Sequence, residues 1–371
     1  MKLNSILIVG GGIGGLTAAI ALRRKGFPVE IVERDAEWTV YGVGIIQQFN
    51  VLRAMASLDL LDAYMSRAYG FDRTRIFSPA GKVADFDAPR LAGEQYPSNA
   101  GIRRPALQKV LATRAEELGV GIRLGVTVEA MSDDGDGVDV VFSDDTVGRY
   151  DIVIGADGVF SRTRTQIMAD APQPRYTGQW VWRYNLPQMP DLAGIDLFVG
   201  PCNAGLVPIG DDTMYMFLLS QEEPGFKLDT NGAAAAMRAR AGVAPPIIAG
   251  LVEDVTRDDG VVGRPLEVIF LDGAWHSGRV VLLGDAVHAS TPHLAQGAGM
   301  AIEDAIVLAE ELSEQDTPEA AFTAYRDRRF ERARFVAETS IRIGDMQMGK
   351  VPPFDVNELQ GRAIAMMAEP I

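Results

Sequence analysis

Glycines near the N-terminus stand in a pattern suited to binding phosphate groups. Gly10, Gly12 and Gly15 follow the apolar run Ile6–Val9, and Glu33 ends the next apolar run. The first glycine permits a tight turn, the second lets the backbone approach a pyrophosphate, and the third allows a helix to pack closely on a strand. The helix N-terminus offers free N–H groups, and the carboxylate can accept hydrogen bonds from ribose hydroxyls. The pattern predicts a dinucleotide site without distinguishing NAD from FAD.

Two further motifs pair a glycine with an aspartate after a short apolar run. They are Asp157-Gly158 and Gly284-Asp285. Because open α/β sheets bind ligands at the carboxyl ends of their strands, we expect Asp285 to project into a ligand site. A helix that begins near Ala298 could direct its N–H groups at negative charge on a reduced flavin ring. The alternative for Asp285 is an aspartate that only caps a turn.

Two other side chains have chemistry that a catalytic site could use. The planar donors of Arg183 could orient an anionic or phenolic substrate, although a surface salt bridge is an equally good interpretation. His293, which follows Pro292, is the histidine best suited to general-base work, and a role in loop structure is the favoured alternative. Cys202 is the single cysteine and lacks metal-ligand spacing, so no metal is expected.

These residues require a scaffold of parallel strands and helices. Short, continuous apolar runs, the pattern of parallel strands covered on both faces, occupy Ile6–Val9, Val29–Val32, residues 151–154 and Val280–Leu283. Between the first two runs, residues 14–25 have helical periodicity and end at Gly26. This arrangement predicts a βαβ unit with the glycines at the strand-to-helix turn.

The region from about Pro172 to Phe270 has a different pattern. Residues 180–186, 197–209 and 214–219 are separated by turns rich in Gly, Pro and Asp, which predicts antiparallel strands. Alanine-rich residues 231–242 are expected to form a helix, and residues 318–342 a charged amphipathic helix. Residues 351–371 form a tail without a clear pattern.

Composition limits the class of protein. A chain of 371 residues is long enough for two domains, and no apolar run is long enough to span a bilayer. A formal charge of −15 argues against nucleic acid and against an anionic membrane surface as partners, so local basic groups must meet any anionic substrate. A single cysteine cannot form an internal disulfide, and we expect a cytoplasmic protein.

In the order and spacing of its motifs, the chain resembles the class A flavoprotein monooxygenases, the aromatic-ring hydroxylases of the p-hydroxybenzoate hydroxylase fold. The resemblance runs from about residue 4 to residue 340 and includes Gly284–His288, Pro292, Gln296-Gly297 and Glu303–Ala305. It is strongest to compact two-domain members such as the salicylate, 3-hydroxybenzoate and urate hydroxylases. The chain departs from the family pattern at Phe49, Ala295 and Gly299-Met300, which stand where proline, glycine and an Asn-x pair are frequent.

The resemblance implies an α/β fold in which a Rossmann-like FAD-binding domain carries an inserted α+β substrate domain built on an antiparallel sheet. The expected FAD-binding domain is discontinuous and comprises residues 1–70, 100–171 and 271–345. The expected substrate-binding domain comprises residues 71–99 and 172–270, and residues 346–371 form the C-terminal tail.

The resemblance also implies residue roles. The glycine loop would hold the FAD pyrophosphate, Glu33 the adenosine ribose and Asp285 the ribityl–pyrophosphate part. The residues expected to bind the cofactor are Gly10, Gly12, Ile13, Gly14, Gly15, Glu33, Arg34, Arg104, Asp157, Gly158, Asp285, Gly297, Ala298, Gly299 and Met300. Inward positions of the antiparallel sheet face the flavin in this family, so Gln47, Arg183, Tyr215 and Met216 are expected in the substrate pocket, with Arg183, Pro292 and His293 as catalytic candidates.

The implied reaction is the hydroxylation of a small phenolic or heteroaromatic substrate. NADH or NADPH would reduce a tightly but non-covalently bound FAD, which would then react with O2 to give a C4a-hydroperoxide. The second glycine fingerprint of a separate nicotinamide domain is lacking, which fits a transient reductant, and we expect a monomer or homodimer. The alternatives are a flavin-dependent dehydrogenase, oxidase or reductase, which would insert no oxygen atom, and a non-catalytic flavin-binding regulator, which would show no substrate-stimulated turnover.

Overall fold

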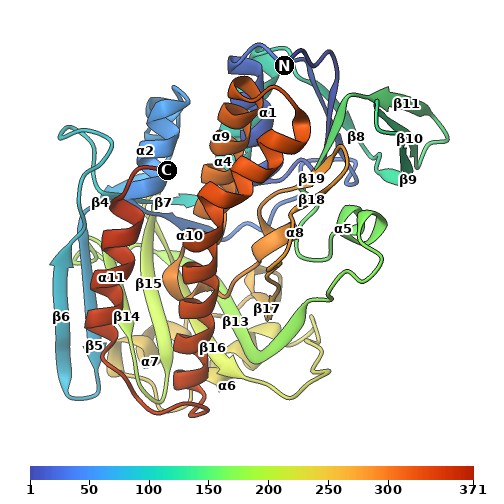
Figure 1. Cartoon of the computed structure of the whole chain (residues 1–371). Helices are drawn as coiled ribbons and strands as arrows, with labels where there is room; N and C mark the ends of the chain where they lie inside the picture. The colour runs from blue at the N-terminus through green and yellow to red at the C-terminus, as the bar shows by residue number, and fades with distance from the viewer.

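The computed structural model of the chain describes residues 1–371, apart from the side chains of residues 356 and 357. A six-stranded sheet lies at the centre of one half of the molecule (Figure 1). Its strands, in spatial order, are β18 (His276–Ser277), β19 (Val280–Leu282), β12 (Ile152–Gly155), β1 (Ile6–Val9), β2 (Val29–Glu33) and β8 (Gly121–Leu124). All pairs are parallel except the one at the edge between β18 and β19.

Helices cover one face of this sheet and a smaller sheet covers the other, which explains why its central strands are continuously apolar. α1 (Ile13–Arg24) connects β1 to β2 and packs against α4 (Arg104–Glu117) and α9 (Gly297–Glu314). The predicted βαβ unit is thus confirmed. On the other face, a three-stranded sheet of β9 (Val128–Asp133), β10 (Val138–Phe142) and β11 (Val147–Tyr150) shares a buried cluster with β1 and β12.

A seven-stranded sheet occupies the other half of the molecule. Its strands, in spatial order, are β17 (Val262–Val268), β13 (Arg175–Pro187), β16 (Thr213–Gln221), β15 (Asn203–Gly210), β14 (Ile195–Phe198), β5 (Arg73–Ser78) and β6 (Gly81–Asp87). The predicted strand over residues 197–209 is corrected to two strands, β14 and β15, because the chain turns between them at Gly200-Pro201. β14 and β5 pair in parallel, so the sheet is mixed rather than wholly antiparallel.

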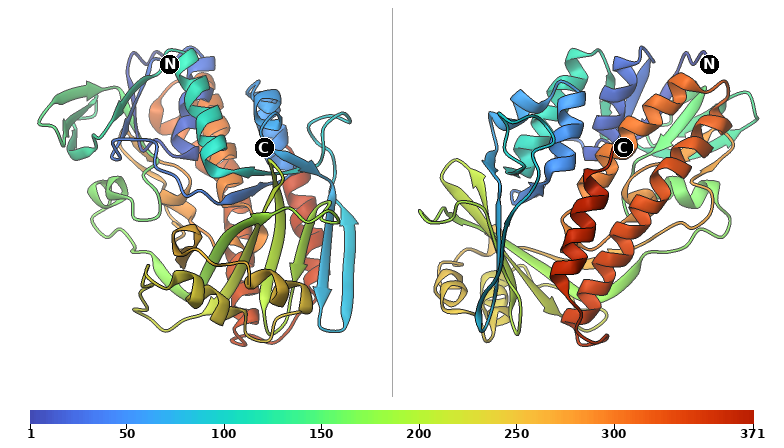
Figure 2. Two further views of the ribbon diagram at one scale, coloured as in Figure 1. Left: turned by 180° about the vertical axis from the view of Figure 1, so that it is seen from behind. Right: turned by 60° about the vertical axis from the view of Figure 1, so that its left-hand side comes forward.

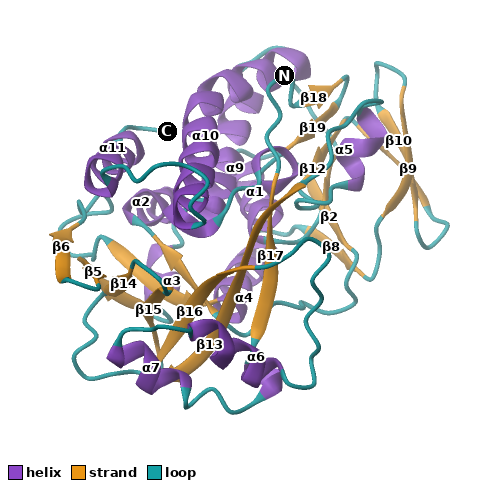
Figure 3. Ribbon diagram, turned by 90° about the horizontal axis from the view of Figure 1, so that it is seen from below, coloured by secondary structure: helices purple, strands orange, loops and turns teal.

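The two faces of the seven-stranded sheet carry different helices. α6 (Ala233–Ala241) and α7 (Pro246–Val252) lie on one face, and α10 (Pro318–Gln347) and α11 (Val356–Ala368) lie on the other (Figures 2 and 3). Met216 and Trp182 pack into the apolar cluster that includes Ala234 and Met237 of α6. The opposite face of the strands is therefore the one available to a ligand.

Shorter elements join the two halves. β3 (Gly44–Gln47), β7 (Asn99–Arg103) and β4 (Tyr69–Phe71) form a small sheet. The remaining elements are α2 (Phe49–Ser57), α3 (Leu61–Met65), α5 (Arg162–Ile167), α8 (Asp285–His288) and the short 3-10 turns η1 (Asp258–Gly260) and η2 (Pro292–Leu294). The tail that lacked a sequence pattern contains α11. Among the residues that the structure describes, no helix has the length and apolar character needed to cross a membrane.

Candidate active site

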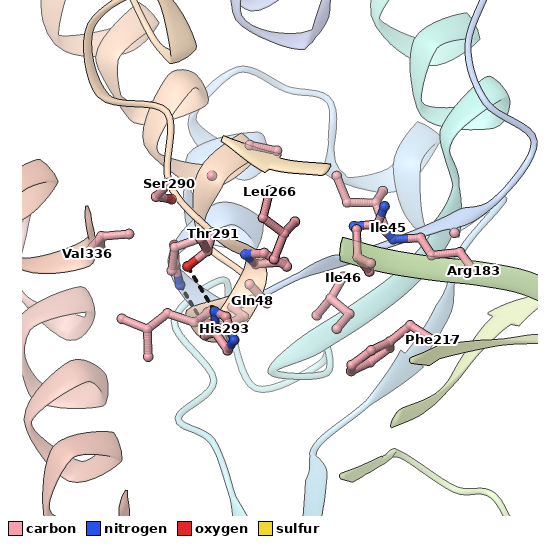
Figure 4. Close-up of a pocket in the computed structure, with 18 of the residues that line it drawn as sticks. Ile45, Ile46, Gln48, Arg183, Phe217, Leu266, Ser290, Thr291, His293 and Val336 are labelled. Carbon is pink, nitrogen blue, oxygen red and sulfur yellow. Dashed lines mark hydrogen bonds between the residues drawn. The ribbon is translucent and has the colours of Figure 1, made fainter. Parts of the chain in front are cut away.

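One elongated cavity of about 690 Å³ lies between the two large sheets. At one end it is lined by the glycine loop, Arg104 and Asp285. At the other end its walls come from the seven-stranded sheet, α10 and α11. Figure 4 shows part of this cavity, which Arg183, Phe217, Gln48 and His293 line from different elements.

The glycine loop has the geometry that a pyrophosphate site requires. Gly10 has a φ of +108°, and a Cβ atom there would lie 2.5 Å from the carbonyl oxygen of Ala156. A Cβ atom at Gly15 would lie 1.9 Å from the carbonyl oxygen of Gly10, so the turn, the strand and the helix pack without room for a side chain. A Cβ atom at Gly12 would meet nothing within 4 Å, because this glycine opens onto the cavity. α1 begins at Ile13 without a side-chain cap, which leaves its first N–H groups free for a ligand.

Glu33 holds this loop in place. Its Oε2 atom accepts a hydrogen bond from the backbone N–H of Gly11 (2.7 Å), and its Oε1 atom accepts one from Asp35 (2.9 Å). Neither Glu33 nor Arg34 lines the cavity, and the side chain of Arg34 is 81% exposed. Gly14 and Ile13 of the predicted set do line it.

The two residues of the Asp157-Gly158 motif have different roles. Gly158, with a φ of +81°, lines the cavity. The carboxylate of Asp157 accepts hydrogen bonds from the backbone N–H of Thr163 (2.9 Å) and from the hydroxyl of Ser161 (2.5 Å). Asp157 thus fixes the start of α5 and, through it, the conformation of the neighbouring glycine.

Asp285 stands just beyond the end of β19 and is accessible from the cavity. Desolvation inside the cavity raises the pKa of its carboxyl, against the opposing effect of His288 and Arg104. The segment that carries Asp285 is held by the buried carboxylate of Asp304. Asp304 accepts hydrogen bonds from the backbone N–H of Gly284 (3.1 Å) and from Arg329 (2.8 Å), and it pairs with His288 (2.6 Å).

Asp304 remains ionised although it is buried. Burial alone would raise the pKa of Asp304, but the charges and hydrogen bonds of His288 and Arg329 lower it to about 2. Arg329 also forms a buried ion pair with Glu303 at 2.8 Å. Through this network His288 helps to hold the segment that carries Asp285.

The loop before α9 passes along the cavity. Pro292, Gly297 and Ala298 line it, whereas Gly299 and Met300 do not. Met300 is 1% exposed because it packs behind the helix start. Ala295 has a φ of +53°, which explains why glycine is frequent at this position in the family that the chain resembles.

His293 is held through both ring nitrogens. Its Nδ1 atom lies 2.8 Å from the hydroxyl oxygen of Thr291, and its Nε2 atom lies 3.0 Å from the Oε1 atom of Gln347. Because an amide oxygen only accepts, Nε2 carries the proton and the Thr291 hydroxyl donates to Nδ1. Burial lowers the pKa of His293 to about 4, so the imidazole is neutral at neutral pH. This geometry favours the loop-structure interpretation over general-base work.

Two arginines face the cavity beside a tyrosine. Arg183 comes from β13, Arg104 from the start of α4, and Tyr215 from β16. Burial, reinforced by the charge of Arg104, lowers the pKa of Arg183 to about 10. In the described part of the chain, neither guanidinium donates a hydrogen bond to another residue, and Arg183 forms no salt bridge. Arg183 is therefore a cation without a carboxylate partner, whereas Arg104 lies within the field of Asp285, so the Arg183 end of the cavity can take an anion.

Strand alternation decides which predicted pocket residues reach the cavity. Tyr215 and Phe217 of β16 face it, so Met216 between them must point to the opposite face, and its assignment to the pocket is corrected. Gln47 is fully buried and does not line the cavity, whereas the adjacent Gln48 does. Gln48 donates to the carbonyl of Leu294 at 3.1 Å and also contacts Gln296. Sequence reasoning missed Gln48 and Phe217, which only the strand register would have revealed.

Comparisons with known proteins agree with this geometry. A family model described as "FAD binding domain" matches residues 4–201 and 270–340. The putative FAD-dependent monooxygenase YetM of Bacillus subtilis is 30% identical over 383 residues, covering 99% of this chain and 100% of that protein. Aurachin C monooxygenase/isomerase of Stigmatella aurantiaca is 32% identical over 347 residues, covering 92% and 89%. The crystal structure of Klebsiella pneumoniae HpxO complexed with FAD and uric acid superposes with a TM-score of 0.83 at 25% identity, covering 99% of this chain and 93% of that one.

Proposed function

The chain belongs to the FAD binding domain family, and from that premise we propose that it is an FAD-dependent monooxygenase that hydroxylates a small phenolic or heteroaromatic substrate at the expense of NAD(P)H. One observation carries the proposal. A single cavity joins a glycine-lined nucleotide end to a sheet-lined end that contains Arg183 and Tyr215.

The nucleotide end fits FAD. Gly12 and the free N–H groups of α1 are placed to bind the pyrophosphate, with Arg104 as a nearby cation. Asp285 would accept hydrogen bonds from the ribityl part, and the N–H groups at the start of α9 near Gly297 would stabilise negative charge on the reduced ring. When bound, FAD supplies hydride acceptance and the activation of O2. The ribose role of Glu33 and the contacts expected of Arg34, Asp157, Gly299 and Met300 remain proposals.

The sheet end is suited to an acidic aromatic ring. A phenol or an enolised heterocycle reacts more readily with an electrophilic oxygen donor when it is ionised. The cation of Arg183 favours that ionised form and orients it, and the Tyr215 hydroxyl offers a further hydrogen bond. Leu266, Phe217 and Ile46 surround this position and exclude water from it (Figure 4). His293 and Pro292 shape the loop beside the ring.

We also propose that the enzyme is cytoplasmic and acts as a monomer or homodimer. The formal charge of −15 and the single cysteine support the first part. Sedimentation velocity of the purified protein tests the second part, and a larger assembly would contradict it.

The test measures flavin content and oxygen transfer in one preparation. Purified protein reconstituted with FAD is screened with phenolic acids and N-heterocycles for stimulated NADH or NADPH consumption. Products are then analysed by mass spectrometry under ¹⁸O2, and we expect one labelled oxygen atom in the product. A protein that does not bind FAD, or that consumes NAD(P)H without inserting labelled oxygen into any compound, would overturn the proposal.

A further inference from the structure

The cavity extends well past the arginines along one face of the seven-stranded sheet. A row of residues paired across adjacent strands begins at Arg183 on β13 and continues through Phe217, Gly205, Leu197 and Ile76. Apart from Gly205, which the Phe217 ring covers, all of these line the cavity. Because neighbouring strands lie about 4.8 Å apart, the four steps of this row span roughly 19 Å, far more than one aromatic ring.

The far part of the cavity, which we call the apolar chamber, is built by β5, β6, β14, β15 and α11. Its lining includes Ile76, Phe86, Ile195, Leu197, Ile364 and Met367. Among the described residues of these elements, the polar side chains that line the cavity are Thr74, Asn203 and Gln360, and none of the three is charged. The charged end at Arg183 and the apolar chamber thus form a cavity with two chemically different ends.

One face of α11 makes the outer wall of the chamber. Gln360, Ala363, Ile364 and Met367 line the cavity, and their spacing places them on a single helical face. Ala365, between them in sequence, is exposed on the other side. The wall is therefore a helix with a largely apolar inner face and a solvent-exposed outer face.

The end of this wall is fixed by two arginines from the rest of the protein. Arg53 donates hydrogen bonds to the carbonyls of Ala368 (2.9 Å) and Glu369 (2.7 Å). Arg332 donates to the carbonyls of Glu369 (3.0 Å) and Pro370 (2.8 Å). Cations at a helix C-terminus satisfy its free carbonyls and stabilise its dipole. The helix that encloses the chamber, α11, is therefore anchored at its C-terminal end.

We infer that the substrate of the proposed monooxygenase is an aromatic ring with an alkyl tail, whose ring lies at Arg183 and whose tail lies in the apolar chamber. The inference rests on the proposed function and adds the class of substrate. A ring without a tail would leave the chamber filled with water against apolar walls, which is unfavourable. The tail instead buries those walls and directs the ring toward the charged end.

The test titrates FAD-loaded protein with a homologous series of 2-alkyl-4-hydroxyquinolines, from methyl to heptyl. Calorimetry and the change in flavin absorbance report the dissociation constants. Each methylene that enters the chamber is expected to tighten binding about three- to fourfold, so the heptyl compound should bind at least about a hundredfold more tightly than the methyl compound. Equal affinities across the series, or no binding by any member, would overturn the inference. Oxygen insertion into a tail-free aromatic would then still uphold the proposed function.

Paired variants of α11 locate the tail. Ala363→Phe places a ring inside the chamber, and Ala365→Phe places the same ring on the exposed face of the same helix. The heptyl-to-methyl affinity ratio should fall at least about tenfold in the first variant and hold in the second. An unchanged ratio in Ala363→Phe would overturn the inference. Leu197→Ser makes the sheet side of the chamber polar, so it should also lower the heptyl-to-methyl affinity ratio. It is the second test if Ala363→Phe does not fold.

Discussion

The two ends of the cavity are built by different means. At the nucleotide end the backbone forms the surface. Gly10, Gly12 and Gly15 matter there because the absence of a side chain allows close packing or leaves space for a ligand. At the substrate end the surface consists of side chains from strands that are distant in sequence, such as Arg183 and Leu197. A change at a tightly packed glycine of the first end, Gly10 or Gly15, therefore alters the fold and cofactor binding together, whereas a change at the second end should alter selectivity alone.

The largest expected effect comes from Gly15→Ala. The added Cβ atom would lie 1.9 Å from the carbonyl oxygen of Gly10, and neither backbone segment can move without separating α1 from β1. We expect the free energy of unfolding, measured with urea, to fall by about 4 kcal/mol, together with loss of FAD binding.

Gly12→Ala provides the matched control, because its Cβ atom meets nothing within 4 Å. Its free energy of unfolding should fall by less than about 1 kcal/mol, the cost of alanine in place of glycine at the N-cap of α1. The FAD dissociation constant should nevertheless rise at least about tenfold, because the methyl group occupies the approach of the pyrophosphate. Wild-type FAD affinity in Gly12→Ala would show that the loop does not bind the phosphates.

Asp304→Asn tests how the nucleotide end is supported from behind. The variant leaves Arg329 and His288 without their shared buried anion, so we expect a loss of about 3 kcal/mol in unfolding free energy and weaker FAD binding. Asp327→Asn, which removes an ion pair whose carboxylate is 63% exposed, should cost less than about 0.5 kcal/mol. Equal losses in the two variants would contradict the supporting role.

Arg183→Gln should affect the substrate end alone. Loss of the cation is expected to raise the dissociation constant of an anionic aromatic ligand about thirtyfold, which corresponds to about 2 kcal/mol. The FAD dissociation constant, measured in the same preparation, should change less than about twofold. Arg257→Gln, whose side chain is 73% exposed on the same half of the molecule, is the control. Parallel losses of both ligands in Arg183→Gln would remove the distinction between the two ends.

His293 should make the stability of the protein depend on pH. Its pKa is lowered from 6.5 to about 4 in the folded protein, so the unfolded state binds more protons between these values. The free energy of unfolding therefore falls as the pH drops from 6.5 to 4. In His293→Gln this fall in the free energy of unfolding should be smaller by about 1 kcal/mol. This is less than the full pKa shift implies, because water screens the partly exposed ring. Identical pH profiles of urea unfolding in the two proteins would be the contrary result.

Ala295→Gly should have the smallest effect. The φ of +53° strains alanine but not glycine, while glycine also gains entropy in the unfolded chain. We expect a net stabilisation of about 0.5 kcal/mol in thermal unfolding, and a destabilisation would show that the strain is absent.

The contrast between the two ends also explains what the sequence could predict. β1, α1 and β2 were predictable because their apolar periodicity and their glycines are local signals. The pocket residues of the substrate end were not, because a one-residue difference decides whether Gln47 or Gln48, and Met216 or Phe217, reaches the cavity. α11 was missed although Gln360, Ala363, Ile364 and Met367 have helical spacing, because nothing in a short tail says what its apolar face will cover.

The wall of the chamber belongs to neither large sheet, because α11 follows their strands in chain order and pairs with none of them. Substitutions on its inner face can therefore resize the chamber without changing the strand order of either sheet. A redesign for ligands of another length needs to keep only the carbonyls that accept hydrogen bonds from Arg53 and Arg332.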